Sequence, residues 1–268
     1  MTKLQPLKRF GQNYLIDNNI IHKIISEFDP QKDDNVIEIG AGTGALTKEL
    51  IKSTGKLYAV EIDKRVVESL ALSFPSVHVI NQDFLKLDLK SSFPEKQYRI
   101  IGNIPYNITS PILFKLINNR QLFTDAMLMV QYEVAKRITA ETQDKDYGIL
   151  GVLSNYFAET KLCFKISPNV FYPKPKVDSA IIQIKFKKDI SNEVDDYLFI
   201  QVVKASFGNR RKKLKNSLSN SIFAGISFKE DEFDMNRRAE ELSIDEFVTL
   251  SKIIKGKLQN INNAIKLI

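Results

Sequence analysis

Short apolar runs alternate with amphipathic stretches between residue 35 and about residue 186. This alternation is typical of a sheet whose strands are joined by crossover helices, and right-handed crossovers make such a sheet parallel and doubly wound. In the helical stretches, apolar residues recur at three- and four-residue spacing. The predicted strands are NVIEIG (35–40), KLYAVEID (56–63), VHVINQD (77–83), YRIIGNI (98–104) and AMLMVQ (126–131), and the predicted helices are ALTKELIKS (45–53), KRVVESLAL (64–72) and SPILFKLINN (110–119).

The last two predicted strands, TKLCFKIS (160–167) and SAIIQIKF (179–186), differ from the others. Only the loop PNVFYPKPKVD (168–178) separates them, and no helix fits into it. They are therefore expected to be antiparallel neighbours. A parallel sheet that ends in an antiparallel strand departs from the dinucleotide-binding pattern. The predicted fold class is α/β, with a Rossmann-like sheet of the methyltransferase type.

The composition changes after Lys188, where the polar stretch DISNEVDD (189–196) is followed only by helical patterns. We therefore expect two domains, a sheet domain over residues 1–188 and a small all-α domain over residues 189–268. The strongest local signal in the second is Ser243-Ile-Asp-Glu246, a capping box that opens an apolar-periodic helix through Ile254.

Length and composition are those of a folded globular protein. With 268 residues, 43% of them hydrophobic, the chain can bury about three quarters of its unfolded surface. The net charge of +7 favours a polyanionic partner such as nucleic acid, although charge alone is a weak argument. A single cysteine, Cys163, excludes an intramolecular disulfide and a cysteine metal cluster. No stretch resembles a signal peptide or a membrane span, so a cytoplasmic, soluble protein is expected. No metal site is predicted.

The first strand ends in the glycine-rich sequence Glu38-Ile-Gly40-Ala-Gly42-Thr-Gly44. Glycines there let the chain turn sharply and let a ligand approach the backbone. The run also satisfies the loose dinucleotide pattern, so by itself it does not distinguish between cofactors.

Two further acidic residues lie at strand ends. Glu61 ends the second strand, where a carboxylate can accept the hydroxyls of a ribose, and Asp83 ends the third, where it can accept an adenine amino group. No basic residue in the glycine loop is available for a pyrophosphate, and Glu38 is expected to add negative charge. This negative electrostatic environment favours the cationic nucleoside S-adenosylmethionine (SAM) over the alternative cofactor, NAD. Alternatively, each of these acids could be an ordinary solvated residue at a strand end, which is the commoner case for any one of them. Three acids at the ends of successive strands nevertheless favour a ligand site.

The fourth strand ends in GNIPYN (102–107), on the same predicted edge. The N6 amino group of adenine is a poor nucleophile, and acceptors that hold its hydrogens out of plane would localise its lone pair. The Asn103 side-chain oxygen and the Ile104 carbonyl could do this, with Pro105 fixing the turn. Tyr106 could stack on the base. The alternative is an ordinary turn before a helix capped at Thr109 or Ser110, and both interpretations can hold.

The chain resembles the ribosomal small-subunit RNA adenine dimethyltransferases, the family that dimethylates two adjacent adenines near the 3′ end of 16S rRNA. The ordered set of motifs is specific, although some are common individually. They are KRFGQNYL (8–15), EIGAGTGALT (38–47), EID (61–63), QDFL (82–85), GNIPYNITSPIL (102–113), FYPKPKVDSAI (171–181), FGNRRKKLKNSL (207–218) and RAEELSIDEF (238–247).

The resemblance implies a role for each matching residue. Tyr106 and Phe171 would flank a flipped target adenine, although without the family Phe171 would be interpreted as loop packing. Catalysis would involve Asn103, Ile104, Pro105, Tyr106 and Phe171, and SAM would be bound by Asn13, Leu15, Gly40, Glu61, Asp83 and Asn103. Ile104 stands where leucine is frequent, but only its backbone is expected to act.

The segment KASFGNRRKKLK (204–215) contains six basic residues and no acidic one. As a bare pattern it is typical of a solvated helix face. The family resemblance instead favours a contact with 16S rRNA in the small subunit during its assembly. The protein is expected to act as a monomer and not to bind a membrane. The residues predicted to contact RNA are Lys204, Arg210, Arg211, Lys212, Lys213 and Lys215.

Three other functions remain open on the sequence. Antibiotic-resistance methyltransferases of 23S rRNA share the Asn-Ile-Pro-Tyr element, but the carboxy-terminal motifs argue against that function. DNA adenine methyltransferases typically present an aspartate where Asn103 stands. A non-catalytic assembly factor on the same scaffold is the third alternative, and the intact Asn103 and Tyr106 argue against a loss of catalysis.

Overall fold

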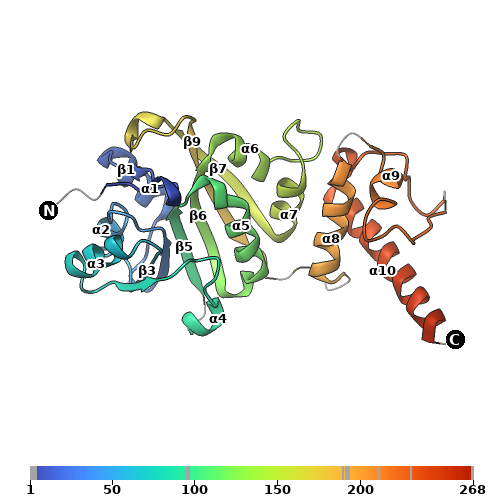
Figure 1. Ribbon diagram of the computed structural model, residues 1–268, viewed down its shortest axis with the longest axis horizontal. Coiled ribbons are helices and arrows are strands. Elements are labelled where there is room, and N and C mark those ends of the chain that lie inside the picture. Colours follow the sequence, from blue (N-terminus) through green and yellow to red (C-terminus); the bar gives the residue numbers. More distant parts are fainter. Residues whose placement is uncertain are drawn as a thin grey trace. The chain divides into compact units, whose positions relative to one another are not determined.

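The computed structural model describes residues 5–94, 97–188, 190, 194–209, 212–229 and 231–266. The chain divides into two compact units, one formed by residues 1–136 with 158–188 and the other by residues 137–157 with 189–268. The second unit thus includes residues 137–157, which the sequence analysis placed in the first domain. Each unit is described by itself (Figure 1).

A seven-stranded sheet forms the centre of the first unit, in the order β4-β3-β2-β5-β6-β9-β7. The strands from β4 to β6 run parallel, and β9 runs antiparallel to both β6 and β7. The predicted fold class is therefore confirmed, since β9, the last strand in the sequence, is antiparallel, while the edge strand β7 runs in the same direction as β6. The strands are β2 (Asn35–Ile39), β3 (Lys56–Glu61), β4 (His78–Asn81), β5 (Tyr98–Asn103), β6 (Phe123–Gln131), β7 (Ala158–Ile166) and β9 (Ser179–Phe186).

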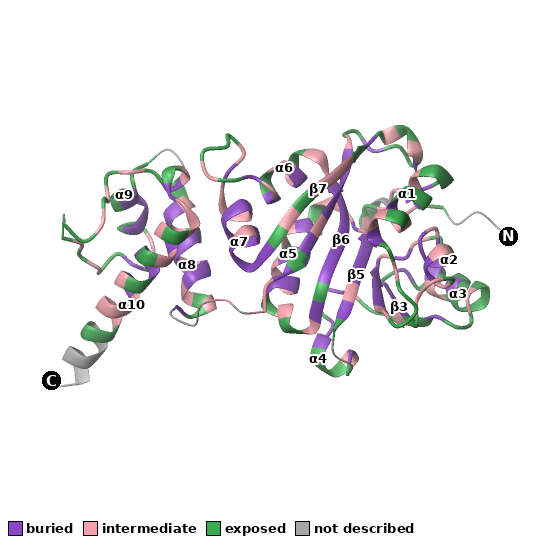
Figure 2. Cartoon of the chain, turned by 180° about the vertical axis from the view of Figure 1, so that it is seen from behind, coloured by how far each residue is buried: buried purple, intermediate pink, exposed green. Residues whose placement is uncertain are grey.

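Helices cover both faces of this sheet. Residues of α1, α2 and α3 form one apolar cluster with alternate strand residues such as Ile101 and Met127. The residues between them, such as Ile100 and Leu128, face the other side, where α5 lies (Figures 1 and 2). The helices of this unit are α1 (Asn18–Phe28), α2 (Thr47–Leu50), α3 (Lys64–Ser73), α4 (Leu89–Ser92), α5 (Thr109–Asn118) and the start of α6 (Tyr132–Ile138), with 3-10 turns at Lys8–Phe10, Tyr106–Ile108, Arg120–Leu122 and Pro168–Val170.

A second, two-stranded sheet was not predicted. β1 (Tyr14–Leu15) pairs antiparallel with β8 (Phe171–Tyr172). The pairing joins the amino-terminal arm to the loop between β7 and β9. Strands of two residues carry no readable alternation, which is why the sequence did not reveal them.

The second unit is helical. It contains α7 (Ile149–Phe157), α8 (Asp196–Ser206), α9 (Leu214–Leu218) and α10 (Ile244–Lys266), with 3-10 turns at Phe207–Asn209 and Ala239–Glu241. Residues 137–157 join it through a hydrogen bond from the Tyr147 hydroxyl to the Leu242 carbonyl, and through stacking of Tyr156 on Phe199. The predicted capping box is confirmed, because Ser243 and Glu246 exchange side-chain-to-backbone hydrogen bonds. None of the described helices has the length and apolar character that crossing a membrane requires.

Arg99, on β5, ties together the amino ends of the central strands. Its guanidinium forms a two-point ion pair with Asp125 of β6 and a further ion pair with Asp34 before β2. It also donates to the Phe28 and Asp29 carbonyls at the end of α1. Asp125 is buried, and these carboxylates hold the Arg99 pKa above its usual range although burial opposes them.

Replacement of Arg99 by Met should destabilise the first unit by about 3 kcal/mol, because it leaves Asp125 buried without its partner. The measurement is the urea midpoint of unfolding. The double variant Arg99→Met/Asp125→Leu should recover part of the loss, since it removes the buried charge as well. An Arg99→Met protein with the wild-type midpoint would show that these ion pairs do not stabilise the fold.

Candidate functional site

A cavity of about 230 Å³ lies at the carboxyl ends of β2, β3 and β5, beside the segment that follows β4. Residues 9–15 of the amino-terminal arm line one side of it. All the residues predicted to bind the cofactor line it, as do three of the predicted catalytic residues in the segment after β5. They are Asn13, Leu15, Gly40, Glu61, Asp83 and Asn103, with Ile104, Pro105 and Tyr106.

The Glu61 carboxylate is the best-anchored group of the cavity. It is 5% exposed and accepts the backbone N–H groups of Gly42, Ile62 and Asp63, at 3.0, 2.9 and 3.0 Å. Burial raises its pKa, while these three hydrogen bonds oppose the rise. Gly42 has a φ of +54°, and a Cβ there would lie 3.1 Å from the Tyr14 ring. Glycine thus allows the loop to turn its N–H onto Glu61 while the arm packs against it.

Burial opposes the negative charge that was expected of Glu38. Glu38 is 1% exposed, and burial raises its pKa to about 8. The Thr47 hydroxyl donates to its Oε2 at 2.6 Å, which offsets only part of the desolvation. Glu38 is therefore mostly neutral at pH 7 and adds little negative charge to the cavity.

Asp83 lies in a turn that a lysine holds from α5. Its Oδ1 accepts the Leu85 N–H at 2.9 Å, and no hydrogen bond to its Oδ2 is found within the part of the chain that the structure describes. The Lys115 ammonium donates to the Leu85 and Leu87 carbonyls at 2.9 and 2.5 Å. One carboxylate oxygen thus fixes the turn and the other is available to a ligand.

The Asn103 side-chain amide has a defined orientation. Its Nδ2 donates to the backbone carbonyl of Asn13, in the amino-terminal arm, at 2.8 Å. Because a carbonyl can only accept, the nitrogen must be the atom that faces Asn13. The Oδ1 of Asn103 is thereby left as an acceptor. Gly102 lets β5 approach β2 closely, since a Cβ there would lie 2.6 Å from the Ile39 carbonyl oxygen.

Tyr106 is held at its hydroxyl, which forms a 2.5 Å hydrogen bond with the Ser179 hydroxyl at the start of β9. Burial raises the Tyr106 pKa. The helix after it begins at Thr109, and its N-cap position is Ile108, which makes no side-chain capping hydrogen bond, so the predicted cap at Thr109 or Ser110 is wrong. Thr109 instead donates its hydroxyl to the Tyr106 carbonyl at 3.1 Å, which fastens the 3-10 turn to the helix.

Phe171 lies apart from the cavity, although it pairs with Leu15, a predicted site residue that does line the cavity. It is 3% exposed, belongs to the apolar cluster of α1–α3, and is not among the residues that line the cavity. In β8 it lies opposite Leu15 of β1. Contact with a target base would require the ribbon of β1 and β8 to shift.

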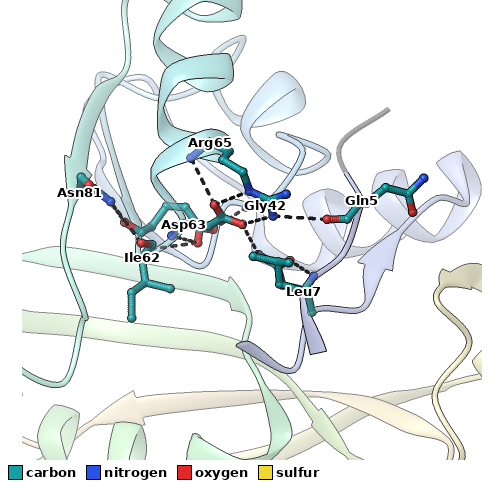
Figure 3. Close-up of polar contacts among 9 residues, drawn as sticks. Gln5, Leu7, Gly42, Ile62, Asp63, Arg65 and Asn81 are labelled. Atoms are coloured by element: carbon teal, nitrogen blue, oxygen red, sulfur yellow. Dashed lines mark hydrogen bonds and ion pairs between the residues drawn. The ribbon is translucent and has the colours of Figure 1, made fainter. Parts of the chain in front are cut away.

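The sequence analysis missed several residues that support the site. Gln12, Asp63 and Arg65 link the arm to the end of β3, beside Glu61 (Figure 3). Asp63 belongs to the EID motif and follows a strand, which could have revealed it, but only Glu61 was given a role. Thr47, Ser179 and Lys115 act across the tertiary structure, and no local pattern indicates them.

The residues present suit a nucleoside with a cationic centre. Among the described residues that line the cavity, Arg9 alone is basic, whereas Glu61 and Asp83 are acidic. A pyrophosphate would meet two acidic side chains and a single basic one there, whereas these acidic side chains favour a sulfonium. Within the described ranges, no group of three His, Cys, Asp or Glu side chains could hold a metal ion.

The model of the ribosomal RNA adenine dimethylase family matches residues 4–256. The chain belongs to this family. The resemblance predicted from the motifs is therefore confirmed, and with it a SAM-dependent methyltransferase.

Individual relatives agree with this family. Ribosomal RNA small subunit methyltransferase A of Chlorobium phaeobacteroides is 44% identical over 255 residues, which are 95% of this chain and 93% of the relative. The protein of the same name from Francisella tularensis subsp. novicida is 41% identical over 258 residues, 94% of this chain and 98% of the relative.

Solved structures of similar proteins extend the comparison. A dimethyladenosine transferase from Plasmodium falciparum has a TM-score of 0.78 and 27% identity, and the match covers 91% of this chain and 98% of that one. The 23S rRNA methyltransferase ErmE has a TM-score of 0.66 and 24% identity over 91% of this chain and all of its own, a likeness that shows the fold alone.

The neutral Glu38 of this dimethylase-family chain predicts a pH-dependent stability. Because its pKa is raised on folding, wild-type stability should fall as the pH rises from about 4.5 to about 8. The Glu38→Gln side chain can still accept the hydrogen bond from the Thr47 hydroxyl but does not titrate. The stability of this variant relative to wild type should therefore increase as the pH rises through this range. The measurement is the urea midpoint at several pH values without added cofactor. Exposed Glu68→Gln is the control, and a constant difference between wild type and Glu38→Gln would contradict a neutral Glu38.

Proposed function

We propose that this protein dimethylates N6 of two adjacent adenines near the 3′ end of 16S rRNA, in the small ribosomal subunit during its assembly. It acts in the cytoplasm as a monomer, with SAM as the methyl donor. The observation that carries the proposal is the fixed amide of Asn103, which leaves an acceptor oxygen beside an acidic nucleoside cavity. The small-subunit substrate is supported by the names of relatives at 41–44% identity.

In this proposal, the cofactor lies along the carboxyl edge of the sheet. Glu61 has one acceptor site left, on Oε2, for a ribose hydroxyl after its three backbone hydrogen bonds. Asp83 accepts the adenine amino group with the oxygen that does not bind Leu85. Asn13, Leu15 and Gly40 contact the remainder. When bound there, SAM supplies the methyl group.

The target adenine faces Asn103 and Tyr106. The Asn103 Oδ1 and the Ile104 carbonyl accept the N6 hydrogens, which localises the nitrogen lone pair, and the proton displaced by methylation leaves to water. One N–H remains after the first transfer, so Asn103 can also orient the second. Tyr106 stacks on the flipped base, whose extrusion costs a few kcal/mol. Phe171 completes the stack once the ribbon of β1 and β8 shifts.

The two predicted domains have different tasks in this proposal. Residues 1–188 carry the chemistry, and residues 189–268 bind ribosomal RNA. Lys204, Lys212, Lys213 and Lys215 are exposed on the helical unit, as phosphate contact requires. Arg210 and Arg211, which complete the predicted set, lie outside the described residues.

Asn103→Ala should lower methyl transfer at least about 100-fold, because the amide that orients the nucleophile is lost. SAM affinity, measured by calorimetry, should stay within a few-fold of wild type. Asn118→Ala, on the exposed face of α5, is the matched control and should change neither. Wild-type turnover in Asn103→Ala would refute the role of the amide.

The substrate is tested directly by nucleoside analysis. Labelled SAM is incubated with the protein and either unmethylated small subunits or naked 23S rRNA, and the RNA is then digested. Dimethyladenosine should carry label only when small subunits are present. Label from 23S rRNA alone would overturn the proposed substrate.

Conversion of Lys212, Lys213 and Lys215 to Gln should weaken binding to small subunits and reduce the slope of log affinity against log salt by about 2. A control triple variant at Lys32, Lys64 and Lys90, which are exposed in the first unit, makes the same change in net charge. Equal slopes for the two variants would show that the predicted segment does not contact phosphates.

A further inference from the structure

The amino-terminal arm is tied to the end of β3 by a set of polar contacts (Figure 3). The Gln12 amide nitrogen donates to Asp63 Oδ2 at 3.2 Å, and its oxygen accepts the Leu7 N–H at 2.7 Å. Arg65 forms an ion pair with Asp63 at 2.6 Å and donates to the Gln5 carbonyl at 3.3 Å. The arm is thus held by a single ion pair at two points, Gln5 and Gln12, and the hydrogen bond from Leu7 to Gln12 closes the segment between them.

Asp63 is itself fixed next to Glu61. It is 3% exposed, its N–H donates to Glu61 Oε1, and its Oδ1 caps the first turn of α3 by accepting the Arg65 N–H. The Arg65 side chain and the Gln12 amide keep the Asp63 pKa below its usual range although burial opposes them, so the group is a carboxylate at neutral pH. A charged acceptor strengthens the hydrogen bond from Gln12.

The same arm continues into the catalytic amide. Asn13 directly follows Gln12, and its carbonyl is the acceptor that orients Asn103. Gly11, before Gln12, lies against the segment that follows β5, since a Cβ there would be 3.4 Å from Asn107 and 3.5 Å from Pro105. A shift of the arm would therefore remove the partner of the Asn103 nitrogen and let the amide rotate.

We infer that Gln12 and Asp63 are positioning residues that connect the cofactor site at Glu61 to the orientation of the Asn103 amide. The inference rests on the proposed function for the meaning of Asn103. It assigns the arm a second task besides lining the cavity, because Asp63 holds Gln12 and Gln12 sets the place of the Asn13 carbonyl. Loosening this contact weakens cofactor binding and lowers the turnover number.

The first test uses S-adenosylhomocysteine and no RNA. Gln12→Met keeps the length of the side chain but removes both amide contacts, and should raise the dissociation constant measured by calorimetry about tenfold. Trypsin cleavage after the exposed Arg9 should be slowed by the ligand in wild type but not in this variant. Gln31→Met, at an exposed residue before β2, is the control and should match wild type in both measurements.

The second test separates positioning from folding. Asp63→Asn can still cap α3, so its thermal midpoint should stay near that of wild type. At saturating SAM, its turnover number should fall about tenfold while the KM for small subunits stays unchanged, because only the Asn103 amide is disturbed. Unchanged turnover, together with wild-type ligand affinity and trypsin protection in Gln12→Met, would overturn the inference.

The two tests also distinguish this inference from the proposed function. Ligand affinity and trypsin protection are measured without any RNA. Gln12→Met could differ from wild type in both measurements while the wild-type protein forms no dimethyladenosine. That result would refute the proposed function and leave the role of the arm contact in cofactor binding intact.

Discussion

The Glu61 carboxylate is the group on which the geometry of the cavity depends. Its oxygens collect N–H groups from the glycine loop and from the two residues that follow β3. Gly42 can present its N–H only because it adopts a positive φ, and Asp63 is brought within reach of the arm because its own N–H is fixed. Backbone from two parts of the edge therefore converges on one buried carboxylate, which fixes the glycine loop relative to the end of β3.

The two ends of the parallel strands serve different purposes. At the amino ends, Arg99 forms ion pairs with both Asp125 and Asp34, so the oxygens that it contacts serve the stability of the fold. At the carboxyl ends, Glu61 and Asp83 are bound mainly by backbone N–H groups and retain acceptor capacity. Parallel strands make this separation possible, because every strand from β4 to β6 presents the same end to the same edge.

Local patterns were enough to predict the strands, the antiparallel pair and the acids at the strand ends. Alternating apolar runs and a short helix-free loop are encoded within a few residues, and the carboxyl ends of parallel strands must share an edge. The contact of Gln12 with Asp63 spans 51 residues, and the ribbon of β1 and β8 pairs only two residues on each side, so neither has a local signature. The charge of Glu38 was misjudged for a related reason, since its complete burial is a tertiary property.

The hydrogen bond between the arm and the Asn103 amide explains why an asparagine suits position 103. The Asn13 carbonyl needs a donor, and the amide nitrogen of Asn103 supplies it while its oxygen remains free. An aspartate at this position would point a carboxylate oxygen at the carbonyl, and the two acceptors would repel each other. An enzyme that uses aspartate there must hold it by a different partner. The arm and the amide therefore constrain each other, and the orientation of the Asn103 amide depends on a backbone carbonyl that is 90 residues away in the sequence.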